Sequence, residues 1–238
     1  MIANYHTHTW RCMHAEGTER EYVERAIEGG LKILGFSDHT PMPYANGYVS
    51  NVKMRLNQLE GYVDTVLNLK KEYEKDIEIH LGLEVEYYPK YLRSFSISRV
   101  SIRSNISRWP SIFSEMRSDD VYSGDETQDP KILERYCLQC REGHADGLLY
   151  LFCPPGSSSF TGDPAVYDHW MRGALRGCER QAFRWRSISW GSAATVITRN
   201  PAFWKIVGEV GNPVIFGSDA HEPDKVWNPA ALKKERRS

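Results

Sequence analysis

Hydrophobic and polar positions along the chain follow two periodicities, one typical of buried strands and the other typical of amphipathic helices. Apolar runs predict strands at residues 1–9, 31–36, 77–85, 148–152 and 214–216. Apolar residues at helical spacing predict helices that begin after residue 18, span about 53–75, 130–141 and 163–171, and begin again near residue 200. Because strands alternate with helices, and no linker or internal repeat interrupts them, the pattern predicts a parallel α/β sheet or barrel.

Residues that begin and end helices support these boundaries. Thr18 and Glu21 have the spacing of a Thr-x-x-Glu capping box, and Gly29 follows the apolar positions of that helix. Asp163 can cap a helix in which Pro164 occupies the first position. A length of 238 residues suits an α/β barrel built as one domain.

Polar side chains gather at the carboxyl ends of the predicted strands. These side chains are His6, His8, His39, Glu84, Asp219 and His221. In a parallel barrel such strand ends face one common mouth, where active sites are built. His14 lies just beyond the first strand and can fold back into the same mouth. His-x-His and Asp-x-His place both members on one face of a strand, because side chains alternate along it.

The combination of these residue types predicts a metal site, although each motif alone is weak. A lone His-x-His pair is more often an ordinary surface feature, and a lone Ser-Asp-His or glutamate is no more specific. Together they provide nitrogen and oxygen ligands suited to zinc, manganese or iron, and a glutamate between two ions can bridge them. Closely spaced ions generate hydroxide and stabilise phosphoryl displacement. His80 and His169 lie outside the pattern and are interpreted as structural or surface residues.

Composition narrows the function classes. Hydrophobic residues make up 41% and charged residues 26%, with a net charge of −1 and a pI near 6.7, so neither a nucleic-acid nor a membrane surface is indicated. No apolar run reaches the roughly 18 residues of a membrane span, and no signal peptide is recognisable. Five cysteines without framework spacing favour a reducing cytoplasm, and Cys137-x-x-Cys140 favours helix packing over a zinc ribbon. We therefore expect a cytoplasmic protein.

Several motifs resemble the PHP (polymerase and histidinol phosphatase) superfamily. They are His6-Thr7-His8-Thr9, His14-Ala15-Glu16-Gly17, Phe36-Ser37-Asp38-His39-Thr40-Pro41, Gly82-Leu83-Glu84-Val85-Glu86, Asp120-Val121-Tyr122-Ser123-Gly124-Asp125 and Gly217-Ser218-Asp219-Ala220-His221. The histidinol-phosphate phosphatase branch is the best match, and the resemblance covers roughly residues 1–91, 119–150 and 200–229. It implies a single PHP domain over residues 1–238, folded as a distorted (β/α)7 TIM-like barrel.

The resemblance also implies the ligands, the reaction and the substrate. One ion would be held by His6, His8, Glu84 and Asp219, and another by His14, His39 and His221. Glu84 would also bridge to a middle ion, for a total of roughly two to three divalent ions (Zn, Mn or Fe). As metal ligands, Glu84, Asp219 and His221 would position a bridging hydroxide that attacks the phosphorus. The implied reaction converts a small phosphate ester, histidinol phosphate, to histidinol and phosphate in histidine biosynthesis.

The chain departs from the family pattern in windows at about residues 92–118, 153–159 and 173–199, and in a basic tail from about 231. Leu92–Ser118 holds nine serines, five arginines and no histidine, where the family has a strand carrying a histidine. Phe152-Cys153-Pro154-Pro155-Gly156 stands in place of Ala-His-Pro-Asp, and Trp185–Thr198 replaces a stretch with a phosphate-facing arginine. The two histidines of the middle ion and that arginine are therefore missing.

A change of reading frame explains these windows. Suitable codons for Phe152–Ser159 read Phe-Ala-His-Pro-Asp-Leu-Leu after one base is removed, and shifts in the other two windows likewise restore family motifs. We therefore expect the intact gene to encode a phosphatase with the full metal set. The chain as written should fold poorly in these windows and be weakly active or inactive, because polar Ser/Arg segments cannot bury strand faces.

Three alternatives remain open. A PHP protein of this kind could hydrolyse phosphotyrosine, a nucleotide or another phosphoester, which a panel of monoesters would separate. A catalytically impaired metal-binding or interaction domain would bind metal without hydrolysis. A proofreading domain associated with a DNA polymerase is disfavoured by the neutral charge and by the lack of an attached polymerase segment.

Overall fold

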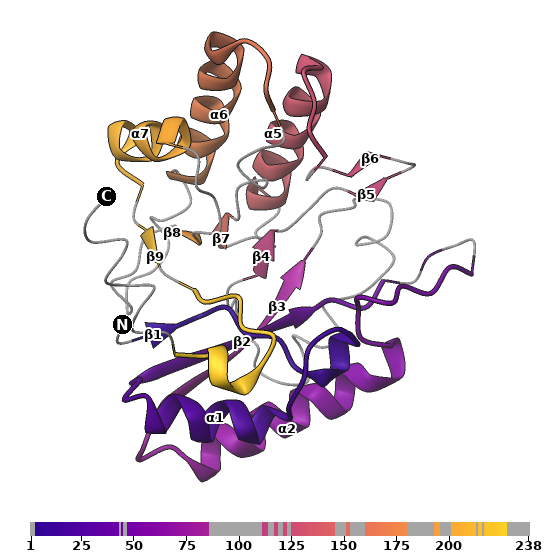
Figure 1. Cartoon of the computed structure of the whole chain (residues 1–238), viewed down its shortest axis with the longest axis vertical. Coiled ribbons are helices and arrows are strands. Elements are labelled where there is room, and N and C mark those ends of the chain that lie inside the picture. The colour runs from indigo at the N-terminus through magenta and orange to yellow at the C-terminus, as the bar shows by residue number, and fades with distance from the viewer. Residues whose placement is uncertain are drawn as a thin grey trace. The chain divides into compact units, whose positions relative to one another are not determined.

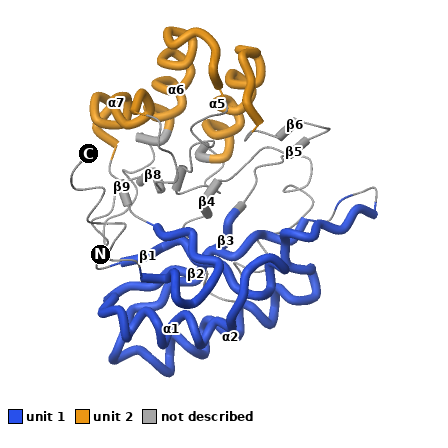
Figure 2. The backbone as a smooth tube through the Cα atoms, viewed as in Figure 1, with its two compact units in different colours: residues 1–84, 89–110, 216–238 blue, residues 85–88, 111–215 orange. Residues whose placement is uncertain are grey.

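The computed structural model describes residues 3–42, 44, 47–85, 111–113, 117–118, 121–122, 125–145, 151–152, 160–179, 193–195, 201–212, 214–215 and 217–227. The chain divides into two compact units (Figure 2), unit 1 with residues 1–84, 89–110 and 216–238, and unit 2 with residues 85–88 and 111–215. The expectation of one PHP domain over the whole chain stays a prediction. No helix in the described ranges is long and apolar enough to cross a membrane.

Three parallel strands form the sheet of unit 1, in the order β1 (Ala3–Asn4), β2 (Ile33–His39) and β3 (Glu78–Val85) (Figure 1). The register places His39 opposite Glu84. Beyond β1 the chain stays alongside β2, because the Ser37 N–H donates to the Thr7 carbonyl at 2.9 Å. Thr7 also forms a parallel bridge with Ala220. The carboxyl end of this sheet therefore collects the segments that carry the candidate residues.

Two helices flank this sheet, α1 (Glu19–Glu28) and α2 (Leu59–Glu72), with short 3-10 helices η1 (Trp10–Cys12), η2 (Leu56–Gln58) and η4 (Pro223–Lys225). The predicted capping box begins α1, since the Thr18 N–H donates to Glu21 Oε2 (2.6 Å) and the Glu21 N–H donates to Thr18 Oγ1 (3.4 Å). Gly30 follows the helix with a φ of 77°, a left-handed conformation that glycine adopts without steric cost.

Two predicted elements of unit 1 are shorter than the sequence pattern suggested. Within the strand predicted at residues 1–9, the strand β1 that pairs with β2 consists of Ala3–Asn4. The helix predicted over about 53–75 begins at Leu59, because Arg55 has extended backbone and its N–H donates to Gln58 Oε1 at 2.7 Å, so the chain first forms η2. Leu56 has helical spacing to Leu59 and Val63 but lies in η2 and is 48% exposed, so the apolar spacing extended the predicted element too far.

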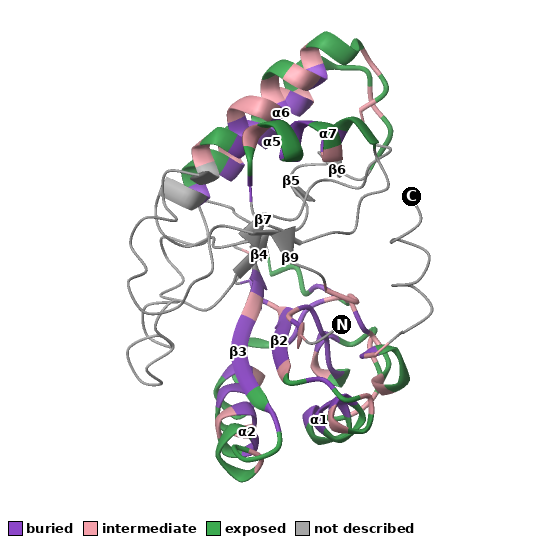
Figure 3. Cartoon of the chain, turned by 90° about the vertical axis from the view of Figure 1, so that its left-hand side faces the viewer, coloured by how far each residue is buried: buried purple, intermediate pink, exposed green. Residues whose placement is uncertain are grey.

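The core of unit 1 fills the space between the two helices and the sheet. Its fully buried side chains include Tyr22 from α1, Tyr62 from α2, Leu34 and Phe36 from β2, and Ile79 from β3. Figure 3 shows buried residues along β2 and β3 and along one face of each helix. Burial of apolar surface stabilises the folded chain by about 25 cal/mol per Å². Packing of these side chains therefore fixes the positions of β2 and β3, whose ends carry His39 and Glu84.

Tyr62 links α2 to the ends of β2 and β3. Its hydroxyl donates to the Gly82 carbonyl at 2.9 Å and accepts from the Asp38 N–H at 3.4 Å, and the side chain is fully buried. We expect Tyr62→Phe to lower the free energy of unfolding by about 1–3 kcal/mol, because buried backbone groups lose a partner. Chemical denaturation measures this change.

Tyr73 offers a matched control for this substitution. Its hydroxyl bonds to Glu24 and Arg20 at the protein surface. Tyr73→Phe should therefore change the free energy of unfolding by less than about 0.5 kcal/mol, as is usual for exposed groups. Equal effects of the two substitutions would show that the Tyr62 hydroxyl is not a structural link.

Unit 2 contains a second set of parallel strands, in the order β4 (Ser111–Phe113), β7 (Leu151–Phe152), β8 (Ala193–Thr195) and β9 (Val214–Ile215). An antiparallel pair consists of β5 (Arg117–Ser118) and β6 (Val121–Tyr122). The helices are α5 (Pro130–Ala145), α6 (Pro164–Glu179) and α7 (Pro201–Val210). Cys137 and Cys140 are buried in α5, as helix packing predicts.

Helix α6 is longer than the sequence pattern predicted. Asp163 precedes it as expected, and Asp163 Oδ1 accepts from the Ala165 N–H at 2.8 Å. The helix continues past residue 171 to Glu179, and Ala174 and Leu175 are buried on it. The first residues of the window at about 173–199 therefore belong to a regular helix with a buried face.

Candidate metal centre

All seven candidate side chains lie in unit 1, on segments that meet at the carboxyl end of its sheet. They are His6 and His8 after β1, His14 after η1, His39 at the end of β2, Glu84 on β3, and Asp219 and His221 before η4. Parallel strands present their carboxyl ends at one edge, and this brings together residues that are far apart in the sequence.

Four of these side chains converge on one point. The Nε2 atoms of His6 and His8 lie 3.0 Å apart. Glu84 Oε2 lies 3.3 Å from His6 Nε2 and 3.1 Å from His8 Nε2, while Asp219 Oδ1 lies 3.2 and 3.0 Å from the same atoms. A tetrahedron with metal–ligand bonds of about 2.0–2.1 Å has edges of about 3.3–3.4 Å. The spacing of the four atoms is therefore close to that of ligands around one divalent ion.

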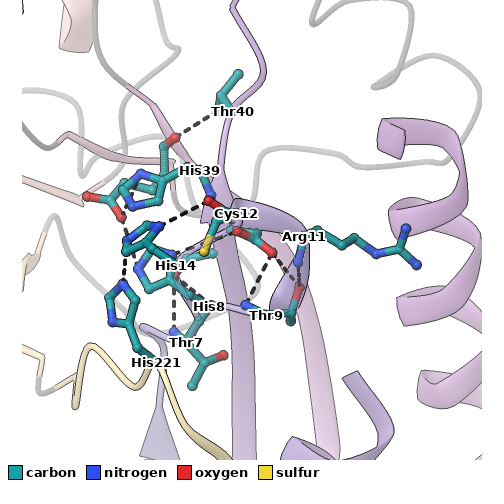
Figure 4. Close-up of polar contacts among 12 residues, drawn as sticks. Thr7, His8, Thr9, Arg11, Cys12, His14, His39, Thr40 and His221 are labelled. Carbon is teal, nitrogen blue, oxygen red and sulfur yellow. Dashed lines mark hydrogen bonds and ion pairs between the residues drawn. The ribbon is translucent and has the colours of Figure 1, made fainter. Parts of the chain in front are cut away.

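Three further histidines gather beside His8. His221 Nε2 lies 2.9 Å from His14 Nε2, and the His221 ring stacks on the His8 ring with centroids 4.3 Å apart. The His39 ring centroid lies 4.5 Å from that of His8 and 5.2 Å from that of His14. His39 Nδ1 faces Glu84 Oε2 at 3.5 Å. Figure 4 shows these four imidazole rings grouped together.

The described part of the chain contains three overlapping groups whose ligand atoms lie within 4.8 Å of one another. The groups are His6, His8 and Asp219; His8, His39 and His221; and His8, Cys12 and Asp38. His8 is common to all three, whereas the family resemblance implies that it binds one ion. Cys12 and Asp38 were not among the predicted site residues.

Asp38 lies on the far side of the His8 ring from the other carboxylates. It is fully buried, and its carboxylate accepts hydrogen bonds from the Thr9 hydroxyl, the Thr9 N–H (3.2 Å) and the His39 N–H (2.9 Å). Asp38 Oδ1 lies 3.9 Å from His8 Nδ1. This distance is too long for a hydrogen bond, and His8 Nδ1 has no hydrogen-bond partner, so Asp38 acts on the ring through its charge. The Ser-Asp-His motif contained the residue, but side-chain alternation puts Asp38 and His39 on opposite faces of the strand, which concealed this role.

Two of the three remaining histidines, His80 and His169, behave as expected. His80 is buried on β3 with its Nε2 atom 3.0 Å from Glu78 Oε1, and burial lowers the pKa of His80 to about 4. His169 is exposed on α6 and contacts the Trp170 ring edge to face. Neither belongs to a group with metal-ligand spacing among the described residues.

The electrostatics of the cluster favour ionised carboxylates. Burial opposes ionisation of Glu84, yet interactions with His39 and His6 and hydrogen bonds to His6 and His8 hold its pKa well below the usual value. Burial also opposes ionisation of Asp219, but His6 and His8 lower its pKa. Burial lowers the pKa of His39 well below its usual value, which favours the neutral form of this ring. Ionised carboxylates and neutral imidazoles are the forms that bind metal.

The carboxylates around His8 favour its protonated form. Burial would lower its pKa, but hydrogen bonds, the largest to Asp219, raise the pKa of His8 well above its usual value. A protonated ring between two acids marks a place where a cation is favoured. A metal ion that binds His8 would displace this proton.

The donor set fits a divalent metal ion. Imidazole nitrogen and carboxylate oxygen together suit zinc, manganese or iron. His39 Nδ1 is buried without a hydrogen-bond partner. Such an atom destabilises the folded state by roughly 1–3 kcal/mol unless something binds it. The buried clusters could therefore bind metal, and the assignment of each residue to an ion stays a prediction.

The residues that would complete a middle ion belong to the departing windows. Of these windows the structure describes residues 111–113, 117–118, 173–179 and 193–195, while 153–159 and the tail from about 231 lie outside the described residues. The reading-frame hypothesis therefore stays a prediction.

Comparison with known proteins finds a matching domain family and relatives that are named histidinol-phosphatases. A family model described as "PHP domain" matches residues 4–159. The chain is 29% identical over 238 residues to the "Probable histidinol-phosphatase" of Deinococcus radiodurans, covering 94% of this chain and 88% of that protein. It is 34% identical over 90 residues to the histidinol-phosphatase of Bacillus subtilis, covering 36% of this chain and 34% of that protein.

A solved structure shows the fold of this chain. The histidinol phosphate phosphatase of Lactococcus lactis subsp. lactis Il1403, complexed with zinc, L-histidinol and phosphate, matches with a TM-score of 0.69 at 19% identity. The match covers 99% of this chain and 91% of that structure, so the two share an α/β PHP fold. The family model covers more than half of the sequence, and the chain therefore belongs to the PHP domain family.

Proposed function

We propose that this protein is a metal-dependent phosphomonoester hydrolase of the histidinol-phosphatase type. The observation that carries the proposal is the convergence of two imidazole nitrogens on two carboxylate oxygens, with each nitrogen 3.0–3.3 Å from both oxygens. Divalent ions held in this way suit phosphate esters, because they neutralise charge on the phosphoryl group.

The proposed ligands divide into two sets. His6, His8, Glu84 and Asp219 hold one ion, and His14, His39 and His221 hold another. Glu84, Asp219 and His221 contribute to catalysis by fixing the positions of the ions, and Asp38 places a carboxylate beside the His8 ring. Bound ions supply Lewis-acid stabilisation and activate water for phosphoryl displacement. The full site takes roughly two to three Zn, Mn or Fe ions in a distorted (β/α)7 barrel.

Histidinol phosphate is the proposed substrate, with histidinol and phosphate as products. The named relatives support this choice, since the Deinococcus protein aligns with 94% of this chain. The Lactococcus structure holds L-histidinol and phosphate together with zinc. Phosphotyrosine, a nucleotide or another phosphoester is the alternative within the same class of reaction.

Phosphate release by the metal-loaded protein tests this proposal. The chain as written and a chain with its three windows restored to frame would be assayed on histidinol phosphate, phosphotyrosine and a nucleoside monophosphate. We expect histidinol phosphate to be preferred, and the restored chain to be at least about 100-fold faster, because ligands of one ion return. A restored chain that binds metal and hydrolyses none of these esters would contradict the proposal.

A catalytically impaired metal-binding domain is the second candidate. The observation that favours it is the absence of histidine from residues 92–118 and 153–159, where a middle ion would find its ligands. The seven remaining candidates would still bind metal. If DNA sequencing confirms the windows as written, we expect bound metal with little or no turnover.

A further inference from the structure

The side chain of Asn4 joins the first strand to the last segment of unit 1. Asn4 ends β1 and is fully buried. Its Nδ2 donates to Ser218 Oγ (2.6 Å) and to the Val226 carbonyl (3.0 Å), while its Oδ1 accepts from the N–H groups of His6 and Ser218 (both 3.1 Å). A side-chain amide offers two donors and one oxygen with two lone pairs. All bonding positions of this amide are therefore used.

The partners of Asn4 adjoin the candidate metal ligands. His6 is itself a candidate, and Ser218 directly precedes Asp219. Because one oxygen receives both N–H groups, the backbones that carry His6 and Asp219 are held to a common point. The two side chains meet where His6 Nε2 lies 3.2 Å from Asp219 Oδ1. A small shift of either backbone would change that distance.

Asp219 has a backbone conformation that needs support. Its φ of 49° lies in the left-handed region, which residues other than glycine adopt at a steric cost. Hydrogen bonds fix the chain on both sides of it, from the Ser218 N–H to Asn4 Oδ1 and from the Ala220 N–H to the His6 carbonyl (3.2 Å). Without Asn4 the chain before Asp219 loses an anchor and can relax.

We infer that Asn4 is a positioning residue for the metal centre, which it serves by holding the backbones of His6 and Asp219 in register. This inference rests on the proposed function, because it assumes that the two side chains bind a metal ion. Asn4 acts through these ligands. Its loss should therefore weaken metal binding, beyond any loss of stability.

Zinc affinity, measured by competition with a chromophoric chelator, tests this inference. Asn4→Leu keeps the branched shape of the side chain and removes all four hydrogen bonds, and we expect it to weaken zinc binding by about 10- to 100-fold, as for other groups that orient ligands. Asn4→Asp keeps both bonds at Oδ1 but places a second oxygen against the Val226 carbonyl. It should give an intermediate loss.

Asn212→Leu is the matched control. Asn212 is a buried residue of unit 2 whose Nδ2 donates to the Leu175 carbonyl at 3.2 Å. Its replacement removes a hydrogen bond made by a buried side-chain amide, from a residue that adjoins no candidate ligand. We expect a lower unfolding midpoint and unchanged zinc affinity.

Ser218→Ala keeps the test decisive if Asn4→Leu does not fold. It removes the bond between Asn4 Nδ2 and Ser218 Oγ and leaves the backbone bonds in place, so a loss of several-fold is expected. Folded variants at Asn4 and Ser218 with wild-type zinc affinity would overturn the inference, as would an equal loss in Asn212→Leu. A folded wild-type chain that binds no zinc would overturn the proposed function as well, so the two failures are distinguishable.

Discussion

Replacement of Glu84 by glutamine is expected to lower zinc affinity by at least about 100-fold, more than is usual for residues outside the ligand shell. Glu84 is buried, and its Oε2 lies 3.3, 3.1 and 3.5 Å from nitrogen atoms of His6, His8 and His39. Glutamine has nearly the same shape but no negative charge, and its amide nitrogen cannot bind a metal ion. Isothermal titration with zinc measures the loss, and any phosphate release should fall with it.

Glu78→Gln is the matched control on the same strand. The Glu78 side chain is 59% exposed and lies 3.0 Å from His80 Nε2. Exposed ion pairs contribute little to stability, so zinc affinity should stay within about twofold of the wild-type value. Unchanged affinity in Glu84→Gln, or equal losses in both variants, would contradict the role proposed for Glu84.

Zinc at about 100 times its Kd is expected to stabilise the folded protein by about 2.7 kcal/mol, because the ion binds the folded chain in preference to the unfolded one. For a chain of this size each kcal/mol raises the unfolding midpoint by about 2–4 °C, so a rise of roughly 5–11 °C should follow. Circular dichroism during heating measures the shift.

The same experiment contains its own controls. A chelator should reverse the rise in midpoint, and Glu84→Gln should show little response to zinc. A wild-type midpoint that is the same with zinc and with chelator would mean that the cluster does not bind the ion in the folded state.

Local sequence signals were sufficient for the elements that position the candidate site. The capping box of Thr18 and Glu21 begins α1 as predicted, and the apolar runs located β2 and β3. Once the strands are parallel, their carboxyl ends share one edge, so the meeting of His39 and Glu84 follows from the pattern. These features depend on residues close together in the sequence or on a general property of parallel sheets.

The roles of Asn4 and Asp38 could not be predicted in the same way. Asn4 bonds to Ser218 and Val226, which lie 214 and 222 residues away, and no local pattern identifies such partners. Asp38 faces away from His39 on the same strand, and its two hydrogen bonds from Thr9 depend on the path of the chain after β1. Periodicity locates elements, whereas contacts of this kind depend on how the segments meet.

The metal content of the purified, folded chain tests the central claim most directly. After dialysis against zinc or manganese and removal of free ions, elemental analysis by mass spectrometry would count the ions that remain. We predict about two ions per chain for the wild-type sequence, since all seven candidate ligands lie in unit 1, and a clear loss in Glu84→Gln. A folded chain without bound metal, or the same content in both proteins, would contradict the claim that this cluster is a metal centre.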